Sequence, residues 1–311
     1  MTAKLRPMPL QRGDKIGILA PSGAVRRTQI EKGVQALKRE GYRVELAKGV
    51  SERKGYLAGE PEQRARDLER FFTRVDIRAI FCARGGFGAI QLLPLLDVKA
   101  VRSHPKIFVG YSDVSVLLNW MSQKCGLVTF HGPMVVMDLA RGLAGQSKDY
   151  FWKTLSGKFA GWQVKGLETI VSGPREVRGE LAGGCLSVIV TTLGTPYEIH
   201  TKGKILFLED IGEKPYRVER MLTHLQMAGK LKGVRGVVFG QFTDCGPDKE
   251  RGLKQIVQEI FQYADYPVLW GFQGGHGRVN LLLPFGVRMA LNPKAGTLSM
   301  LESPTAVNQI E

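Results

Sequence analysis

Residues 106–120, KIFVGYSDVSVLLNW, decide the fold class of this chain. The apolar run Lys106–Gly110 is typical of a buried strand, and it leads through a polar turn into a helical stretch. Two upstream stretches repeat the order of strand, turn and helix: KIGILAPSG at residues 15–23 and AIFCARGGFG at residues 79–88. Continuous apolar strands that alternate with helices predict a parallel sheet covered by helices on both faces.

The pattern of strands and helices weakens between about residues 142 and 178 and then resumes. We therefore predict an N-terminal doubly wound α/β domain, of the flavodoxin or Rossmann kind, over residues 1–145. A linker region over 146–175 and a C-terminal α/β domain over 176–311 follow.

Composition excludes several classes of protein. The 311 residues are 43% hydrophobic and 23% charged, which is enough apolar material for a sizeable core and rules out wholesale disorder. The net charge is +15, of which residues 1–150 carry +11. No run of Lys and Arg exceeds two residues and no aromatic-rich RNA-binding signature occurs, so we favour a solvated basic surface over a nucleic-acid partner. An acidic substrate stays compatible with this charge.

The sequence also gives no sign of a membrane or metal protein. We read no signal peptide at the N-terminus, and no stretch reaches the roughly 18 apolar residues of a membrane helix. No H-E-x-x-H motif occurs, and no C-x-x-C pair arises among the cysteines Cys82, Cys125, Cys185 and Cys245. We expect a soluble, cytoplasmic protein without a metal.

Ser112 is the first candidate for chemistry. A serine between a strand and a helix presents its hydroxyl at the carboxyl edge of the sheet, and the amide of Asp113 then lies at a helix N-terminus, where it can stabilise an oxyanion. Taken alone, Ser112 fits an ordinary helix N-cap better. In the loop Arg84-Gly85-Gly86-Phe87-Gly88, the amide of Gly86 could be a second oxyanion donor, and a phosphate loop or a plain tight turn are the alternatives.

A serine nucleophile needs a base and an acceptor that orients the base. Among five histidines, His276 lies in the flexible frame Gly274-Gly275-His276-Gly277, which favours a catalytic role over that of a loop histidine. Glu209 ends the predicted strand Lys204–Leu208, where a carboxylate points toward the crevice of an α/β sheet. A helix-start acid is the alternative interpretation of Glu209.

The motifs together resemble the serine L,D-carboxypeptidases, the muramoyltetrapeptide carboxypeptidase family, over essentially the whole chain. Seven pieces occur in the order of that family: Gly13-Asp14 with Ala20-Pro21-Ser22-Gly23, Ala83-Arg84-Gly85-Gly86-Phe87-Gly88, Gly110-Tyr111-Ser112-Asp113, His131-Gly132-Pro133, Gly183-Gly184-Cys185-Leu186, Leu208-Glu209-Asp210 with Tyr216-Arg217-Val218-Glu219-Arg220, and Gly275-His276-Gly277 with Asn280 and Leu283-Pro284-Phe285-Gly286.

The resemblance implies a catalytic triad of Ser112, Glu209 and His276, with an oxyanion hole at the amides of Gly86 and Asp113. It also implies a smaller, swivelling-type C-terminal domain, a homodimer, and no metal or cofactor. Cys185 departs from the family, where asparagine is common, and this puts one contact of the cleft in doubt.

The function implied is removal of the terminal D-alanine from a cytosolic murein tetrapeptide during peptidoglycan recycling. One alternative is hydrolysis of peptide–nucleotide antibiotics, as in the microcin-immunity branch of the family. Another is a non-catalytic α/β protein that binds a nucleotide or a sugar through the glycine loop and the basic surface.

Overall fold

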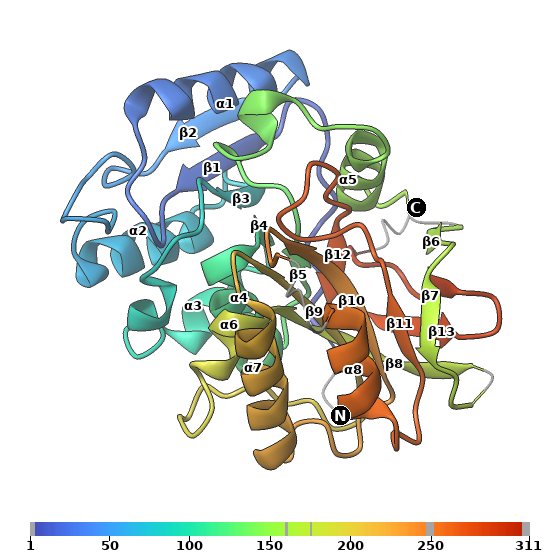
Figure 1. Ribbon diagram of the computed structural model, residues 1–311. Helices are drawn as coiled ribbons and strands as arrows, with labels where there is room; N and C mark the ends of the chain where they lie inside the picture. Colours follow the sequence, from blue (N-terminus) through green and yellow to red (C-terminus); the bar gives the residue numbers. More distant parts are fainter. Residues whose placement is uncertain (1–3, 159–160, 175, 247–251, 307–311) are drawn as a thin grey trace. The chain divides into compact units, whose positions relative to one another are not determined.

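The computed structural model describes residues 4–158, 161–174, 176–246 and 252–306. The chain forms two compact units (Figure 1). Unit 1 comprises Met1–Lys158, Arg278–Gly286 and Ser303–Glu311, and unit 2 comprises Phe159–Gly277 and Val287–Glu302. Two segments late in the chain therefore belong to unit 1. The domain boundaries predicted from the sequence, at 145 and 176, assign these segments to the C-terminal domain.

Unit 1 is built on a six-stranded sheet with the order β12-β5-β4-β3-β1-β2. Strands β1 to β5 are parallel, and β12 joins β5 antiparallel at one edge. The sheet reverses its strand order at β1 and β3, which is the switch point of a doubly wound fold. The strands are β1 (Lys15–Leu19), β2 (Arg43–Leu46), β3 (Ala79–Cys82), β4 (Ile107–Gly110), β5 (Thr129–His131) and β12 (Leu283–Phe285).

Helices cover both faces of this sheet. Gly17 of β1 leaves room for the ring of Phe71 on one face, where Phe72 also stacks on Phe108 of β4. On the other face, Phe81 of β3 meets the ring of Phe151 edge to face. The helices and helical turns of unit 1 are α1 (Arg27–Arg39), α2 (Pro61–Thr73), η1 (Ala89–Leu92), α3 (Val98–Ser103), η2 (Ser112–Val114), α4 (Ser115–Trp120), the π-helical turn η3 (Met121–Cys125), η4 (Leu139–Arg141) and α5 (Ser147–Leu155).

Unit 2 has an eight-stranded mixed sheet with the order β6-β14-β13-β8-β9-β10-β11-β7. Its central strands β8 to β11 run parallel, and antiparallel strands flank them on both sides. The strands are β6 (Gln163–Val164), β7 (Glu168–Val171), β8 (Val177–Cys185), β9 (Lys204–Ile211), β10 (Gly236–Thr243), β11 (Val268–Trp270), β13 (Arg288–Asn292) and β14 (Thr297–Met300).

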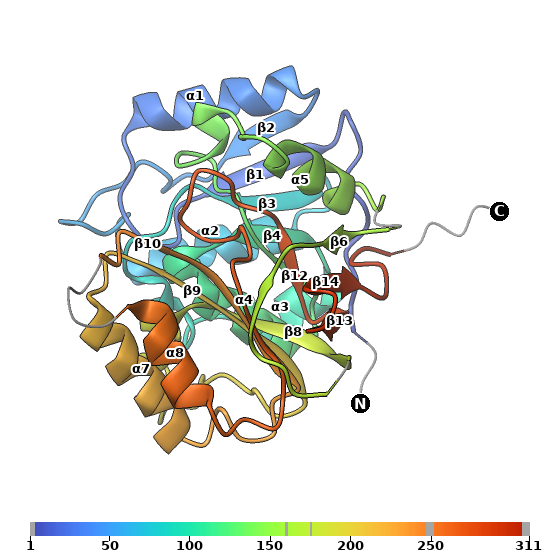
Figure 2. The ribbon, with the colours of Figure 1, turned by 45° about the vertical axis from the view of Figure 1, so that its right-hand side comes forward.

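Three helices cover one face of the unit 2 sheet: α6 (Leu186–Val190), α7 (Pro215–Met227) and α8 (Leu253–Phe261). Helices α7 and α8 lie side by side (Figure 2). Leu222 of α7 and Val257 of α8 are fully buried in one hydrophobic cluster with Leu206 and Phe239 of the sheet. Both units are therefore α/β, and the doubly wound fold predicted for the N-terminal part is confirmed.

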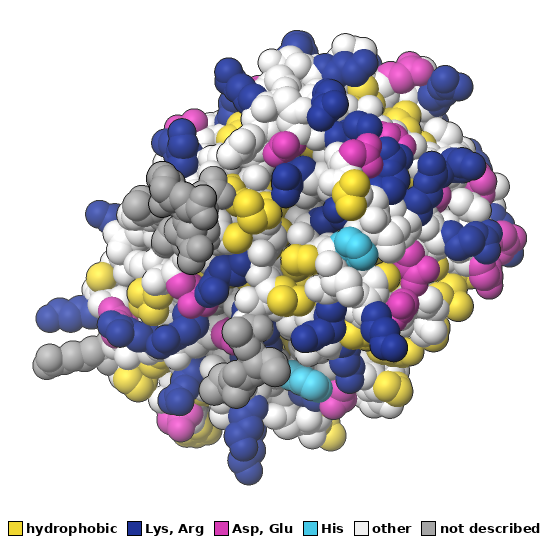
Figure 3. Space-filling model, turned by 180° about the vertical axis from the view of Figure 1, so that it is seen from behind, with side chains coloured by type: hydrophobic (Ala, Val, Ile, Leu, Met, Phe, Trp, Pro, Cys, Tyr) yellow, Lys and Arg dark blue, Asp and Glu magenta, His cyan; other side chains and the backbone are white. Residues whose placement is uncertain are grey.

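On one face of the molecule, basic side chains lie among acidic ones (Figure 3). Figure 3 shows Lys and Arg side chains over one face of the molecule, with Asp and Glu side chains between them. Within the described ranges, no helix has the length and apolar character needed to cross a membrane.

Candidate active site

Ser112 begins a helical turn directly after strand β4 in unit 1. Its φ is +60°, a left-handed conformation that it shares with only one other non-glycine residue of the described ranges, Asp244. This conformation costs an L-residue about 1–2 kcal/mol, so it persists only where surrounding contacts impose it. Gly110 lets the chain turn so sharply, because a Cβ there would lie 2.7 Å from the Val114 side chain. The turn is similar to the strained strand-to-helix elbow that presents a nucleophilic serine.

The glycine loop after β3 lies against this serine. A Cβ on Gly85 would stand 2.9 Å from Oγ of Ser112 and 3.3 Å from the amide nitrogen of Asp113, so a side chain there would fill the space beside both groups. The next residue, Gly86, is exposed and has a φ of +113°. The structure thus brings the loop of Gly86 beside Ser112 and Asp113, the three predicted site residues of unit 1.

Buried polar contacts that no sequence motif marks hold the loops after β1, β3 and β4. The Asp113 carboxylate accepts a 2.8 Å hydrogen bond from the amide of Ala89, at the start of η1. Burial raises the pKa of this carboxyl group. Arg64 of α2, 2% exposed, donates to the carbonyls of Pro21 at 2.6 Å and Gly88 at 2.9 Å. The Arg64 guanidinium therefore ties the loop after β1 to the loop after β3.

In unit 2, the structure brings Glu209 and His276 together. Nδ1 of His276 lies 2.7 Å from Oε2 of Glu209, and the two side chains are 10% and 0% exposed. Glu209 lies inside β9, which extends to Ile211, rather than directly after the strand as predicted. Gly275 permits the contact, since a Cβ there would lie 2.4 Å from Oε2 of Glu209. A buried carboxylate on Nδ1 orients an imidazole so that Nε2 can accept a proton.

Gln241 of β10 fixes the loop that carries His276. Its backbone amide donates to the carbonyl of Gly274 at 3.1 Å, and its side-chain Oε1 accepts from the backbone amide of Gly277 at 3.0 Å. Both neighbours of the Gly275-His276 pair are thereby bound to one residue of the sheet. Gln241 could not be found from the sequence, because a glutamine in an apolar strand carries no motif.

Cys185 lies opposite Glu209 on the neighbouring strand. Its thiol is 3.4 Å from Oδ1 of Asp210, which also accepts from the hydroxyl of Ser187 at 3.0 Å. Burial is the main cause that raises the pKa of the Cys185 thiol well above its usual value. This thiol is therefore held in its protonated form and is a poor nucleophile.

The other histidines lie in different settings. His131 is fully buried in β5 between the rings of Tyr111 and Phe285. Nδ1 of His104 contacts the carbonyl of Ala100 at 3.2 Å, at the end of α3. Among the residues that the structure describes, no group of three or more His, Cys, Asp or Glu side chains is placed to hold a metal ion.

Two models of protein-family domains match this chain. Residues 16–132 match the model of the LD-carboxypeptidase N-terminal domain, and residues 178–291 match that of the LD-carboxypeptidase C-terminal domain. The chain belongs to the LD-carboxypeptidase family. The family expected from the motifs is confirmed, and as an LD-carboxypeptidase the protein is a hydrolase of the serine carboxypeptidase class.

Similar proteins include LD-carboxypeptidases with named activities. The probable murein peptide carboxypeptidase of Bacillus subtilis strain 168 is 36% identical over 291 residues, which cover 92% of this chain and 91% of the relative. The murein tetrapeptide carboxypeptidase of Pseudomonas aeruginosa is 33% identical over 281 residues, with 88% and 91% covered.

Two solved structures are similar to this chain over nearly its whole length. MccF in complex with glutamyl sulfamoyl guanosine gives a TM-score of 0.90 at 27% identity, with 97% of this chain and all 100% of the other covered. The muramoyltetrapeptide carboxypeptidase from Oxalobacter formigenes gives a TM-score of 0.83 at 32% identity, with 94% and 100% covered.

Proposed function

We propose that this LD-carboxypeptidase removes the C-terminal D-alanine from murein tetrapeptides in the course of peptidoglycan recycling. The observation that supports this most is the buried contact between Glu209 and Nδ1 of His276, because it prepares an imidazole for general-base work. The relatives named for murein peptides, at 33–36% identity, support the substrate class.

In this proposal Ser112 is the nucleophile and His276 is the base. The imidazole takes the Ser112 proton as Oγ forms a bond to the carbonyl carbon that precedes D-alanine. The C–N bond then breaks, and the imidazolium gives its proton to the leaving amine. Water hydrolyses the acyl-enzyme by the same route in reverse order. Glu209 stays ionised throughout and stabilises the imidazolium.

The amides of Gly86 and Asp113 are the proposed donors to the tetrahedral oxyanion. The position of the glycine loop against Ser112 supports this assignment, since Gly85 approaches both the serine side chain and the Asp113 nitrogen. Removal of one such donor costs other enzymes about 10²–10³-fold in kcat. The proposal needs no metal and no organic cofactor.

Turnover on three synthetic peptides tests the proposal. We expect release of D-alanine from a tetrapeptide whose last bond joins an L-centre to D-alanine. A tripeptide without D-alanine and a pentapeptide that ends in D-alanyl-D-alanine should stay intact. Hydrolysis of the pentapeptide alone, or of none of the three, would exclude an L,D-carboxypeptidase.

A second candidate function has its own support. MccF bound to glutamyl sulfamoyl guanosine gives a higher TM-score than the muramoyltetrapeptide carboxypeptidase, 0.90 against 0.83. A microcin-immunity type hydrolase would cleave an aminoacyl sulfamoyl nucleoside faster than the tetrapeptide. Parallel measurement of kcat/KM on both substrates separates the two functions.

We also propose that the protein acts as a homodimer in the cytoplasm. This agrees with the family resemblance and with recycled tetrapeptides as substrates. Sedimentation equilibrium would show a species of twice the chain mass, and a monomer at micromolar concentration would contradict the dimer.

A further inference from the structure

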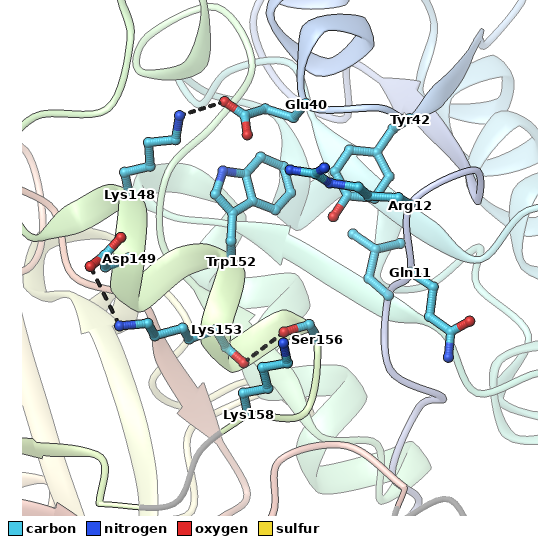
Figure 4. Close-up of a pocket in the computed structure, with 11 residues that line it drawn as sticks. Gln11, Arg12, Glu40, Tyr42, Lys148, Asp149, Trp152, Lys153, Ser156 and Lys158 are labelled. Atoms are coloured by element: carbon cyan, nitrogen blue, oxygen red, sulfur yellow. Dashed lines mark hydrogen bonds and ion pairs between the residues drawn. The ribbon is translucent and has the colours of Figure 1, made fainter.

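Two cavities of similar size lie in unit 1, and acidic side chains line only the first of the two. The first, of about 650 Å³, lies where the chain enters β1 and β2 (Figure 4). Two of its lysines are paired with acids: Lys148 is 2.8 Å from Glu40, and Lys153 is 3.4 Å from Asp149. Its aromatic rings, those of Tyr42 and Trp152, stack on each other. Arg12 and Lys158 also line this cavity, so it keeps a positive excess, but half of its cations are paired with acids of its own lining.

The second cavity, of about 690 Å³, lies at the carboxyl ends of β1 and β3. Its lining contains three arginines, Arg26, Arg53 and Arg84, and no acidic residue. Within the described part of the chain, none of these arginines forms an ion pair. In doubly wound sheets, ligands bind at this switch point of the strand order.

Arg84 is held with its guanidinium toward this cavity. Its Nη1 donates to the carbonyl of Ala24 at 3.4 Å, across the gap between the two loops. Its Nε is buried and has no hydrogen-bond partner in the described structure. A guanidinium carries five N–H donors, so Arg84 keeps donors for an acidic ligand that enters the cavity.

The cavity adjoins the nucleophile through the glycine loop. Gly86 lines it, and a Cβ on Gly86 would lie 3.9 Å from Nη2 of Arg84. A Cβ on the preceding residue, Gly85, would lie 2.9 Å from Oγ of Ser112. A carboxypeptidase must recognise a carboxylate one residue beyond the bond it cleaves, and one residue of peptide spans roughly 3.5 Å. Because Arg84 directly precedes Gly85, it is the arginine of the lining that the chain connects to the loop beside Ser112.

We propose that this arginine-lined cavity is the subsite for a carboxylate of the peptide substrate, an inference that rests on the proposed function. The guanidinium of Arg84 donates charge-assisted hydrogen bonds to the carboxylate, and the exposed Arg53 adds charge at the rim. The exposed rings of Tyr56 and Phe87, edge to face at 5.9 Å, cover the apolar part of the same residue. The carboxylate is the C-terminal one or that of an acidic residue upstream of the cleaved bond.

Three peptides distinguish the two sources: a tetrapeptide with a free terminal carboxylate and one upstream glutamate, its C-terminal amide, and the free acid with glutamine in place of that glutamate. The proteins are the wild type, Arg84→Gln, Arg53→Gln and the control Arg27→Gln. Arg27 is an exposed arginine of α1 that pairs with Glu31 and does not line the cavity.

We expect Arg84→Gln to raise KM for the free acid about tenfold to a hundredfold, because a hydrogen bond to a charged group is lost. Arg53→Gln should raise it less, and Arg27→Gln should match the wild type. The Arg84 effect should vanish on whichever peptide lacks the recognised carboxylate. An unchanged KM in both Arg84→Gln and Arg53→Gln, or an equal loss on all three peptides, would overturn the subsite.

The same set of proteins separates failure of the subsite from failure of the proposed function. If the wild type cleaves the free acid and the arginine variants behave like it, the function stands and the subsite is wrong. If the wild type cleaves no peptide, the function is wrong. Calorimetry of the three peptides with Ser112→Ala protein then decides the subsite, because equal affinity for all three peptides would refute it.

Discussion

The carboxylate of Glu209 is fully buried and lies 2.7 Å from Nδ1 of His276, which is itself only 10% exposed. A proton on Nδ1 donated to this carboxylate leaves the lone pair on Nε2, the atom that a serine proton needs. Loss of the charge should therefore affect turnover far more than folding.

We expect Glu209→Gln to lower kcat by about 10²–10⁴-fold with little change in Tm, since an amide oxygen fills the same space but does not stabilise an imidazolium. His131→Gln is the comparison, because His131 is fully buried between two aromatic rings and has no proton to move in the proposed mechanism. His131→Gln should lower Tm, and its loss of kcat should be much smaller than that of Glu209→Gln. A dead His131→Gln beside a nearly normal Glu209→Gln would make His131 the base.

Ser112 offers a pair of substitutions that separate chemistry from strain. Ser112→Ala and Ser112→Gly both remove the hydroxyl, so both should lose about 10⁴-fold or more in kcat. They should differ in stability, because alanine keeps the left-handed strain at φ +60° and glycine does not. Urea unfolding should find the glycine variant more stable than the alanine variant by about 1 kcal/mol. A tenth of wild-type activity in either variant would contradict the serine mechanism.

Much of unit 1 could be predicted because its strands are continuous apolar runs. The expected strand at Lys106–Gly110 is Ile107–Gly110 in the structure. The pairing of β12 with β5 could not be predicted, since it joins residues about 150 positions apart and no local pattern encodes it. In β8, Gly183 and Gly184 resemble a loop in the sequence, yet they continue the strand. A Cβ on Gly183 would lie 1.9 Å from the carbonyl oxygen of Phe207.

The candidate site was predictable where a motif marks a backbone feature. Glycines around Ser112 and His276 indicate tight turns, and the structure has left-handed or closely packed residues at both. Arg64 and Gln241 were not predictable, because each acts through backbone carbonyls or amides of loops far away in sequence. The roles of all five predicted site residues stay predictions, for which activity measurements are needed.

Because of Lys106, the free energy of unfolding should change with pH in the alkaline range. It is buried and donates to the carbonyls of Arg74 and Ile77, and burial lowers its pKa to about 8. Between pH 8 and about 10.4, the unfolded lysine keeps its proton and the folded one loses it, so this group adds stability as pH rises. The free energy of unfolding of wild type minus that of Lys106→Met should therefore increase from pH 8 to pH 10. A constant difference would mean that the folded lysine titrates normally.

Gly275 and Gly271 form a matched pair that tests whether the exact position of Glu209 matters. Both glycines have a positive φ, +119° and +95°, so alanine is strained at either position and should destabilise both variants. Nothing lies within 4 Å of a Cβ on Gly271, whereas a Cβ on Gly275 would meet Oε2 of Glu209 at 2.4 Å. Gly275→Ala must therefore displace the carboxylate or the loop of His276.

We expect kcat of Gly275→Ala to fall about a hundredfold, because a shift of about 1 Å in a catalytic group can cost that much. Gly271→Ala should keep nearly full kcat despite its strain. The measurement is kcat on the tetrapeptide at a temperature well below both Tm values, so that unfolded protein does not contribute. If the two variants lose activity equally, strain in the loop and not the contact between Glu209 and His276 limits turnover. If neither loses any, the catalytic assignment of this pair is wrong, since a displaced carboxylate could no longer hold the imidazole in place.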